Sequence, residues 1–141
     1  DMSASSPTDP SFRPLGKPPK LPNGVTVPLS PGYQVSDLLF TSGQLAFDSS
    51  GALDPDADTK AQTLQCLANA EAVLAEAGVD RNRIFKASVW LTAKADFGAF
   101  NAGWAEFFGG HYPARSTVRS ELMLPGALVE IEVIAYKGDS K

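Results

Sequence analysis

Apolar and polar residues recur along the chain with two different periods, and the longer period predicts two helices. Between residues 59 and 78, leucine and alanine return at every third or fourth position, which is typical of an amphipathic helix. Gly78 stands where a helix often ends in a left-handed residue. The face that this spacing predicts is apolar except for one glutamate and consists of Leu64, Leu67, Ala68, Glu71 and Leu74.

A second helix is predicted over residues 96–108, where aromatic residues follow the same period. Asp96 precedes the first aromatic residue and is a suitable N-cap, because its carboxylate can accept from the first free backbone N–H groups. The aromatic stripe is most simply a core-facing surface and consists of Phe97, Phe100, Trp104, Phe107 and Phe108.

The shorter period, strict alternation, predicts strands in the rest of the chain. Residues 83–92 alternate so that Ile84, Lys86, Ser88 and Trp90 share one face, opposite Phe85, Ala87, Val89 and Leu91. Residues 33–47 indicate two strands joined by a turn at 36–37, with Leu38, Phe40 and Ser42 on one face. A further strand is predicted over 25–29, ending at Pro28, and 48–58 is predicted to be a loop.

Two last strands are predicted over about 115–122 and 127–136, and Pro125-Gly126 between them favours a hairpin turn. The order of elements is strands, helix, strand, helix and a strand pair, which indicates an α+β domain with both helices on one face of the sheet. The other face of such a sheet is left open, and in a domain of this size another subunit often covers it.

Composition divides the chain into two parts. Residues 1–22 contain six of the eleven prolines and are predicted to be an extended or disordered tail. Residues 23–141 are then one folded domain, since 141 residues suffice for a single core.

Charge and residue counts exclude several kinds of protein. The net charge is −4 and the 12 basic residues are scattered, so we expect no nucleic-acid surface. With one cysteine, Cys66, and one histidine, His111, the chain offers no intrachain disulfide and no pattern of a metal site. Cys66 is expected to be a packing residue and His111 a loop residue. No run of apolar residues is long enough to span a membrane, and no secretion signal is evident, so a cytoplasmic protein is expected.

Two glutamates interrupt the most hydrophobic predicted strand, "LVEIEVIAY". Glu130 and Glu132 are two residues apart and share one strand face, with their Cα atoms about 7 Å apart. They lie either on a solvated outer face of the sheet or in a polar pocket that uses one carboxylate chemically. An arginine, Arg115, stands at the start of the preceding strand.

Three stretches of the chain resemble the RidA/YjgF/UK114 family of enamine/imine deaminases, which also carries the label endoribonuclease L-PSP. They are "LLFTSGQLAFD" (38–48), "FNAGWAEFFGGHYPARSTV" (100–118) and "PGALVEIEVIAY" (125–136). The resemblance implies a chorismate-mutase-like homotrimer with an inner barrel and sites between subunits. It also implies cofactor-free hydrolysis of 2-enamino or 2-imino acids to 2-keto acids and ammonia.

The same resemblance assigns the candidate site residues. Arg115 of "PARS" falls on the family's carboxylate-binding arginine, and Glu130 on its water-handling glutamate, with Glu132 as the alternative carboxylate. Ser42 and Gly43 fall on its "SGQ" motif, and Ser42 is assigned to substrate positioning or proton relay. Thr117 and Asn101 match two further substrate-binding positions. Leu29 replaces a pocket tyrosine of the best-known members, which predicts a less polar wall.

Geometry and chemistry leave alternatives open. In a regular hairpin turning near Pro125, Arg115 would face Ala135, about 16 Å along the strand from Glu130. Either a bulge shifts this register or the pair is completed by a second subunit, and we favour the second. A trimer that binds small keto acids without turnover is the alternative function, and ribonuclease or translation inhibition ranks below both.

Overall fold

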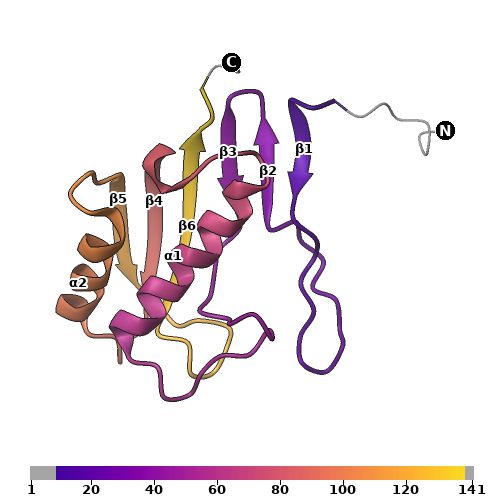
Figure 1. Cartoon of the computed structure of the whole chain (residues 1–141). Coiled ribbons are helices and arrows are strands. Elements are labelled where there is room, and N and C mark those ends of the chain that lie inside the picture. Colours follow the sequence, from indigo (N-terminus) through magenta and orange to yellow (C-terminus); the bar gives the residue numbers. More distant parts are fainter. Residues whose placement is uncertain (1–8, 139–141) are drawn as a thin grey trace.

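The computed structural model describes residues 9–138, in which six strands and two helices form two layers (Figure 1). In chain order these elements are β1 (Phe12–Leu15), β2 (Gly32–Val35), β3 (Leu38–Thr41), α1 (Thr59–Ala75), β4 (Ile84–Leu91), α2 (Phe97–Phe108), β5 (Ala114–Arg119) and β6 (Val129–Tyr136).

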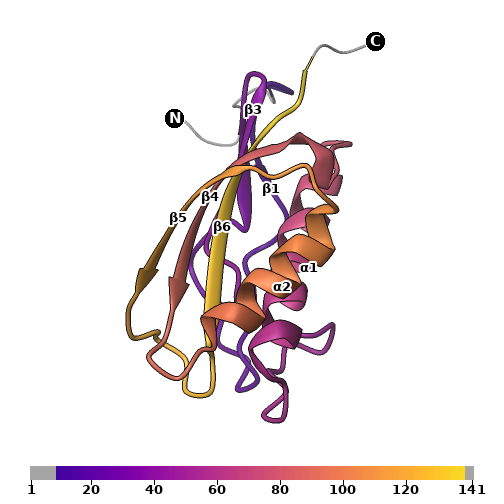
Figure 2. The same ribbon diagram turned by 90° about the vertical axis from the view of Figure 1, so that its left-hand side faces the viewer.

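The strands form one mixed sheet in the order β1-β2-β3-β6-β4-β5. Every neighbouring pair is antiparallel except β4 and β5, which run parallel. Parallel strands need a crossover connection, and α2 supplies it between β4 and β5. Since β3 is also parallel to β4, with β6 inserted between them, α1 is a second crossover in the same direction. Right-handed crossovers in one direction place both helices on one face of the sheet, and Figure 2 shows both there. This confirms the predicted α+β layers.

The first helix is confirmed in place, but its buried face differs from the predicted one. Asp58 caps it by accepting from the Ala61 backbone N–H at 2.9 Å. Gly78, just beyond the helix, has a φ of +76°, as its expected role in the helix end requires. Leucine and alanine are so frequent that several faces look apolar, and polar residues with backbone partners join the buried face. That face consists of Thr59, Gln62, Thr63, Cys66, Leu67, Ala70, Val73 and Leu74.

The second helix matches the prediction more closely. The Asp96 carboxylate accepts from the Ala99 backbone N–H at 3.0 Å, which confirms the N-cap. Phe100, Trp104, Phe107 and Phe108 are buried, whereas Phe97 at the first turn is exposed. Phe97 still lies against the aromatic stripe, with its ring stacked at 6.3 Å from that of Phe100.

Three predicted strand features are wrong. The register between β4 and β6 shifts between Ile84 and Lys86, so Ile84 is buried and Phe85 is 45% exposed, the reverse of simple alternation. The stretch Val25–Leu29 forms no strand and makes only a bridge from Lys20 to Thr26. The predicted hairpin between the last two strands does not exist, because β4 lies between β5 and β6.

The predicted tail also needs a correction where the structure describes it. Phe12–Leu15 form β1, which pairs with β2, and Leu15 is fully buried in the core. Residues 9–22 are therefore not a wholly disordered segment, and residues 1–8 of the predicted tail lie outside the described residues. The domain boundary at residue 23 stays a prediction.

The sheet face opposite the helices is rich in apolar side chains. Strand pairing places them on one surface, which Figure 2 shows uncovered by this chain. Its most exposed large apolar members are Phe12, Val35, Leu38, Phe40, Val118 and Tyr136. Exposed apolar side chains gathered on one face in this way mark an interaction site. No helix within residues 9–138 has the length and apolar character needed to cross a membrane.

Candidate functional site

Arg115 lies on β5, the edge strand, and faces the helix layer. It pairs with Ala87 on β4, which is buried under the helices. Because paired residues point to the same side of a sheet, Arg115 points to the helix side as well. The guanidinium carbon lies 5.0 Å from the ring centres of both Phe100 and Trp104 on α2. Stacking on two aromatic rings holds the cation in place.

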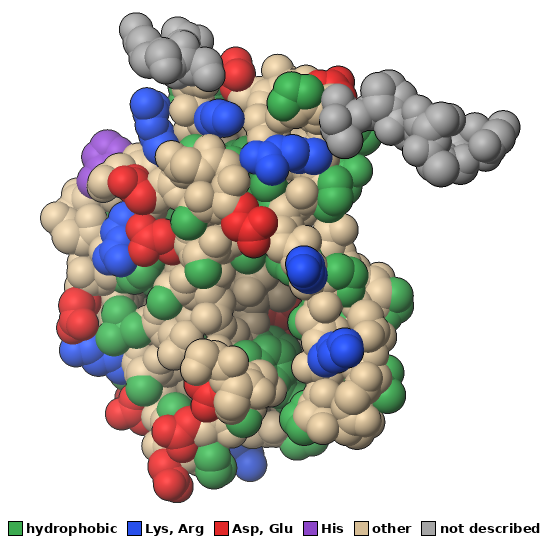
Figure 3. Space-filling view, turned by 45° about the vertical axis from the view of Figure 1, so that its right-hand side comes forward, with side chains coloured by type: hydrophobic (Ala, Val, Ile, Leu, Met, Phe, Trp, Pro, Cys, Tyr) green, Lys and Arg blue, Asp and Glu red, His purple; other side chains and the backbone are tan. Residues whose placement is uncertain are grey.

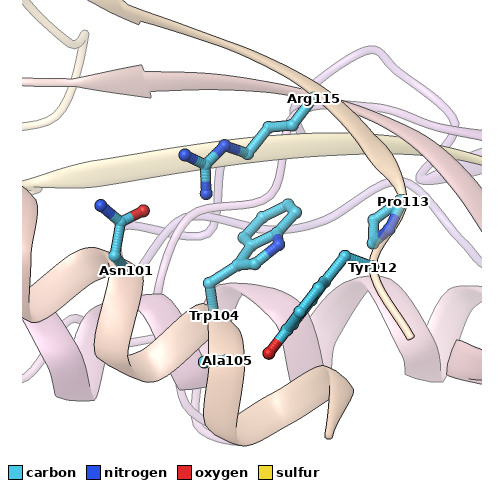
Figure 4. A pocket seen from close by; sticks show the side chains of 6 residues that line it. All are labelled: Asn101, Trp104, Ala105, Tyr112, Pro113 and Arg115. Carbon is cyan, nitrogen blue, oxygen red and sulfur yellow. The ribbon is translucent and has the colours of Figure 1, made fainter. Parts of the chain in front are cut away.

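A pocket of about 430 Å³ opens beside this guanidinium. Figure 4 shows the Arg115 guanidinium and the Asn101 amide pointing towards one another on one side of Trp104, with Tyr112 on the other side. The pocket is lined by Asn101, Trp104, Ala105, Tyr112, Pro113 and Arg115. The predicted residues Asn101 and Arg115 are thus brought together.

The electrostatics of Arg115 favour an anionic ligand. Desolvation by the surrounding side chains lowers the pKa of its guanidinium, yet an arginine stays protonated throughout the physiological range. Within residues 9–138 the guanidinium has no hydrogen-bond or ion-pair partner. A partly desolvated cation without a counter-charge binds a carboxylate well, and guanidinium does so through two parallel hydrogen bonds.

Glu130 lies on the opposite face of the sheet, in one row with Trp90. It is half-buried, and burial, followed by the charge of Glu132, raises the pKa of its carboxyl group. A carboxylate with a raised pKa is better suited to accept a proton from water near neutrality than an ordinary glutamate. The half-burial of Glu130 favours a pocket carboxylate over a freely solvated one.

Gly43 makes room for Glu130. A Cβ atom placed on Gly43 would lie only 2.9 Å from the carboxyl carbon of Glu130, closer than two carbon atoms approach without repulsion. The two residues meet because Gln44, next to Gly43, bridges to Ile131. Gly43 therefore allows the carboxylate to lie against the backbone of the "SGQ" segment.

The hydroxyl group of Ser42 is engaged by the backbone. Its Oγ donates to the carbonyl oxygen of Ser30 at 2.7 Å, and its N–H donates to that of Pro31 at 2.8 Å. This bond fastens the segment before Gly43 to the loop that carries Leu29. The proton that Ser42 would relay is committed to that carbonyl group in this arrangement.

Thr117 shares the helix-side face with Arg115, two residues further along β5. Its Oγ1 is buried and has no hydrogen-bond partner among the described residues. Buried hydroxyl groups are nearly always hydrogen-bonded, but Thr117 does not line the Arg115 pocket, so its hydroxyl group does not reach that pocket in this arrangement. Leu29 is 39% exposed and does not line that pocket.

Sequence reasoning missed the far wall of the pocket. Ala105 and Tyr112 line it, but an exposed alanine on a helix and a tyrosine in a loop carry no distinctive pattern. A usable signal was present in the helical spacing, because Asn101, Trp104 and Ala105 lie three and four residues apart and therefore share one face of α2.

Arg115 and Glu130 do not meet within one chain. Arg115 shares a row with Ala87 and Val133, and Glu130 is three residues from Val133 along β6. The two residues are therefore separated by about 10 Å across the sheet and about 10 Å along it, and they point to opposite faces. The second-subunit explanation is compatible with this geometry, and the hairpin explanation is wrong.

No group of three or more His, Cys, Asp or Glu residues that could hold a metal ion occurs in the described part of the chain. Cys66 is buried, and its burial raises the pKa of the thiol. His111 is exposed in the loop between α2 and β5. Neither residue therefore contributes to the pocket.

Comparison with known proteins gives consistent matches. A family model described as Endoribonuclease L-PSP matches residues 22–137. The RutC family protein y4sK of Sinorhizobium fredii is 38% identical over 111 residues, covering 79% of this chain and 88% of the relative. The YjgF gene product of E. coli has a TM-score of 0.77 at 28% identity, covering 89% of this chain and 99% of that one. E. coli TdcF, solved with bound serine, has a TM-score of 0.76 at 28% identity, with coverages of 89% and 99%.

Proposed function

Because the chain belongs to the RidA/YjgF family, whose model is described as Endoribonuclease L-PSP, we propose that it hydrolyses 2-enamino and 2-imino acids. The products are 2-keto acids and ammonia. The single observation that carries the proposal is Arg115, a partly desolvated guanidinium with no partner in the described chain, held over two aromatic rings at one end of a pocket.

Arg115 binds the carboxylate of the substrate through paired hydrogen bonds. The Asn101 amide lies beside it (Figure 4) and can donate to the same carboxylate or to the imine nitrogen. TdcF was solved with bound serine, and an amino acid presents the same carboxylate next to a nitrogen-bearing carbon. This supports a ligand of the same shape here.

Glu130 positions a water molecule and accepts one of its protons. The water oxygen forms a bond to the electrophilic imine carbon, and the resulting carbinolamine carries both hydroxyl and amino groups. The proton held by Glu130 passes to the nitrogen, the C–N bond breaks and ammonia leaves. Glu130, again a carboxylate, accepts the hydroxyl proton as the carbonyl forms. Positioned acid–base groups typically accelerate such steps by about 10²–10⁴-fold. The reaction needs no cofactor, since the protonated imine is already electrophilic.

The working site requires a second copy of the chain. Arg115 is on an edge strand and Glu130 is on the uncovered apolar face, so an adjoining subunit can bring its Glu130 to the Arg115 pocket. We propose a cyclic homotrimer in which the uncovered faces form an inner barrel. Burial of the exposed apolar side chains provides the driving force.

The other functions receive less support. Binding without turnover leaves the raised pKa of Glu130 without a role. Ribonuclease activity is not favoured by the charge distribution, because basic side chains are interspersed with acidic ones on the face in Figure 3 rather than gathered in one patch.

The test is a rate measurement on imines generated in solution by an amino-acid oxidase. The wild-type protein should accelerate keto-acid release, and Arg115→Ala should lose at least 100-fold in kcat/KM, because the carboxylate anchor is removed. Tight keto-acid binding without acceleration would instead favour the binding function. An unchanged rate in Arg115→Ala would reject the anchor.

A further inference from the structure

The pocket beside Arg115 extends well beyond the group that would hold a carboxylate. Arg115 and Asn101 form its polar end, and Trp104 lies between this end and the residues Tyr112 and Pro113 (Figure 4). The second end therefore consists of aromatic, aliphatic and methyl surface, with the phenol oxygen of Tyr112 directed away from Arg115.

We propose that this pocket selects 2-imino and 2-keto acids with a large apolar side chain, which lies over Trp104 and extends towards Tyr112. The inference rests on the proposed function for the reacting end of the ligand. Trp104, Ala105 and Tyr112 are then specificity-determining residues, distinct from the groups that hold the carboxylate or handle water.

Within the single chain, before a second subunit adjoins it, the pocket has room for a ligand larger than a four-carbon acid. Its volume of about 430 Å³ lies within the range of about 300–1,000 Å³ typical of sites that bind drug-sized molecules. A three- or four-carbon acid anchored at Arg115 would leave the end near Tyr112 filled only with water. A branched or aromatic side chain would displace that water from apolar surface.

The apolar end of the pocket combines a fixed tryptophan ring with two exposed residues. Trp104 is only 4% exposed and packs against Phe100 and Phe108 at ring distances of 5.5 and 4.9 Å, so its orientation is fixed. Ala105 is exposed and has only a methyl group, which leaves room beside Trp104. Tyr112 is 56% exposed and can close over a bound side chain.

The experiment compares imines derived from alanine, leucine and phenylalanine, each generated by an amino-acid oxidase, in four proteins. Ala105→Leu fills the apolar end, Tyr112→Ala removes its outer wall, and Ala102→Leu is the matched control on an exposed position of α2 outside the pocket. Both leucine variants keep a strong helix former on the helix surface, so the fold should persist, and circular dichroism checks it.

We expect kcat/KM of the wild-type protein to be about tenfold higher or more for the phenylalanine-derived imine than for the alanine-derived one, since hydrophobic pockets discriminate by about 10- to 200-fold per methylene. Ala105→Leu should reduce or reverse this preference, because it lowers kcat/KM more for the phenylalanine-derived imine than for the alanine-derived one. Tyr112→Ala should weaken the preference, and Ala102→Leu should preserve it. A flat or declining series in an active wild-type protein overturns the inference and leaves the deaminase function intact.

If the wild-type protein accelerates none of the imines, the proposed function fails and the inference is decided by calorimetry. Tighter binding of phenylpyruvate than of pyruvate, lost in Ala105→Leu but kept in Ala102→Leu, would support the selective pocket. Equal affinity for the two keto acids, or no binding of either, would overturn it.

Discussion

Replacing Gly43 with alanine is the most specific perturbation of Glu130 that the structure offers. The φ of Gly43 is not in the left-handed region, so alanine causes no backbone strain there. The added methyl carbon would lie 2.9 Å from the carboxyl carbon of Glu130. Because non-bonded carbons rest at about 3.5–4.0 Å, the carboxylate must move by about 1 Å.

A displacement of this size should be costly to a reaction that depends on a positioned water. Misplacement of a catalytic group by about 1 Å can reduce a rate by about 100-fold, which corresponds to about 2.7 kcal/mol of transition-state stabilisation. Gly43→Ala is therefore expected to lose about 100-fold in kcat, with little change in the affinity for a keto-acid product, since Arg115 is untouched.

The assay is imine hydrolysis followed by keto-acid formation, with thermal unfolding as a check of the fold. Gly98→Ala on α2 is the matched control, because an added Cβ there meets only the Asp96 carboxylate oxygen at an ordinary 3.4 Å. In a Glu130→Gln background, Gly43→Ala should have little further effect, as the two changes act on one group. Full activity of Gly43→Ala, or a second 100-fold loss in that background, would refute the reasoning.

Three further predictions concern stability and pH. Burial raises the pKa of Glu130 above its ordinary 4.5, so this group stabilises the fold at low pH, and that stabilisation is lost as pH rises through the folded-state pKa. Glu130→Gln should therefore raise the Tm at neutral pH but not at pH 4. Equal shifts of the Tm at both pH values would contradict this. Ser42→Ala removes the bond to Ser30 and should lower the free energy of unfolding by about 1 kcal/mol with less than a tenfold loss of activity; a larger loss at unchanged stability would indicate a catalytic hydroxyl. Hydrogen bonds from Arg81 lower the pKa of Glu71 below 4.5, so their stabilisation is present above pH 4.5 and is lost as pH falls through the folded-state pKa. Glu71→Gln should lower the free energy of unfolding by about 1–2 kcal/mol at neutral pH and leave it unchanged in strong acid. Urea unfolding at the two pH values measures this difference.

Local features of the fold were predictable because they depend on neighbours in the sequence. The Asp96 cap and the burial of Phe100 and Trp104 follow from helical spacing alone. Alternation also indicated the two faces of β6 correctly, with Ile131 and Val133 buried. The shift near Ile84 was not predictable, because a bulge depends on the partner strand.

The pairing of strands was less accessible. Two successive strands joined by Pro125-Gly126 look like a hairpin, but alternation within a strand does not show which other strand it pairs with. The nine residues between β5 and β6 are enough for the chain to pass β4 and pair on its other side. This error moved Arg115 next to Ala135, whereas its row actually contains Ala87 and Val133.

The candidate site was also predictable only in part. Motif resemblance assigned Arg115, Asn101 and Glu130, and the structure brings the first two into one pocket but places Glu130 on the far side of the sheet. Their roles remain predictions. The apolar end of the pocket is formed by one face of α2 and the loop containing Tyr112. Helical spacing could have indicated that face of α2, but the position of the loop against it depends on the tertiary arrangement.

Subunit mixing tests the central claim, that Arg115 of one chain works with Glu130 of another, most directly. Arg115→Ala and Glu130→Gln proteins are each expected to be inactive, and they are denatured, mixed in equal amounts and refolded together. In randomly assembled cyclic trimers, about one quarter of the interfaces combine an intact arginine with an intact glutamate, so about a quarter of wild-type activity should return. A mixture no more active than the separately refolded variants would contradict the shared site.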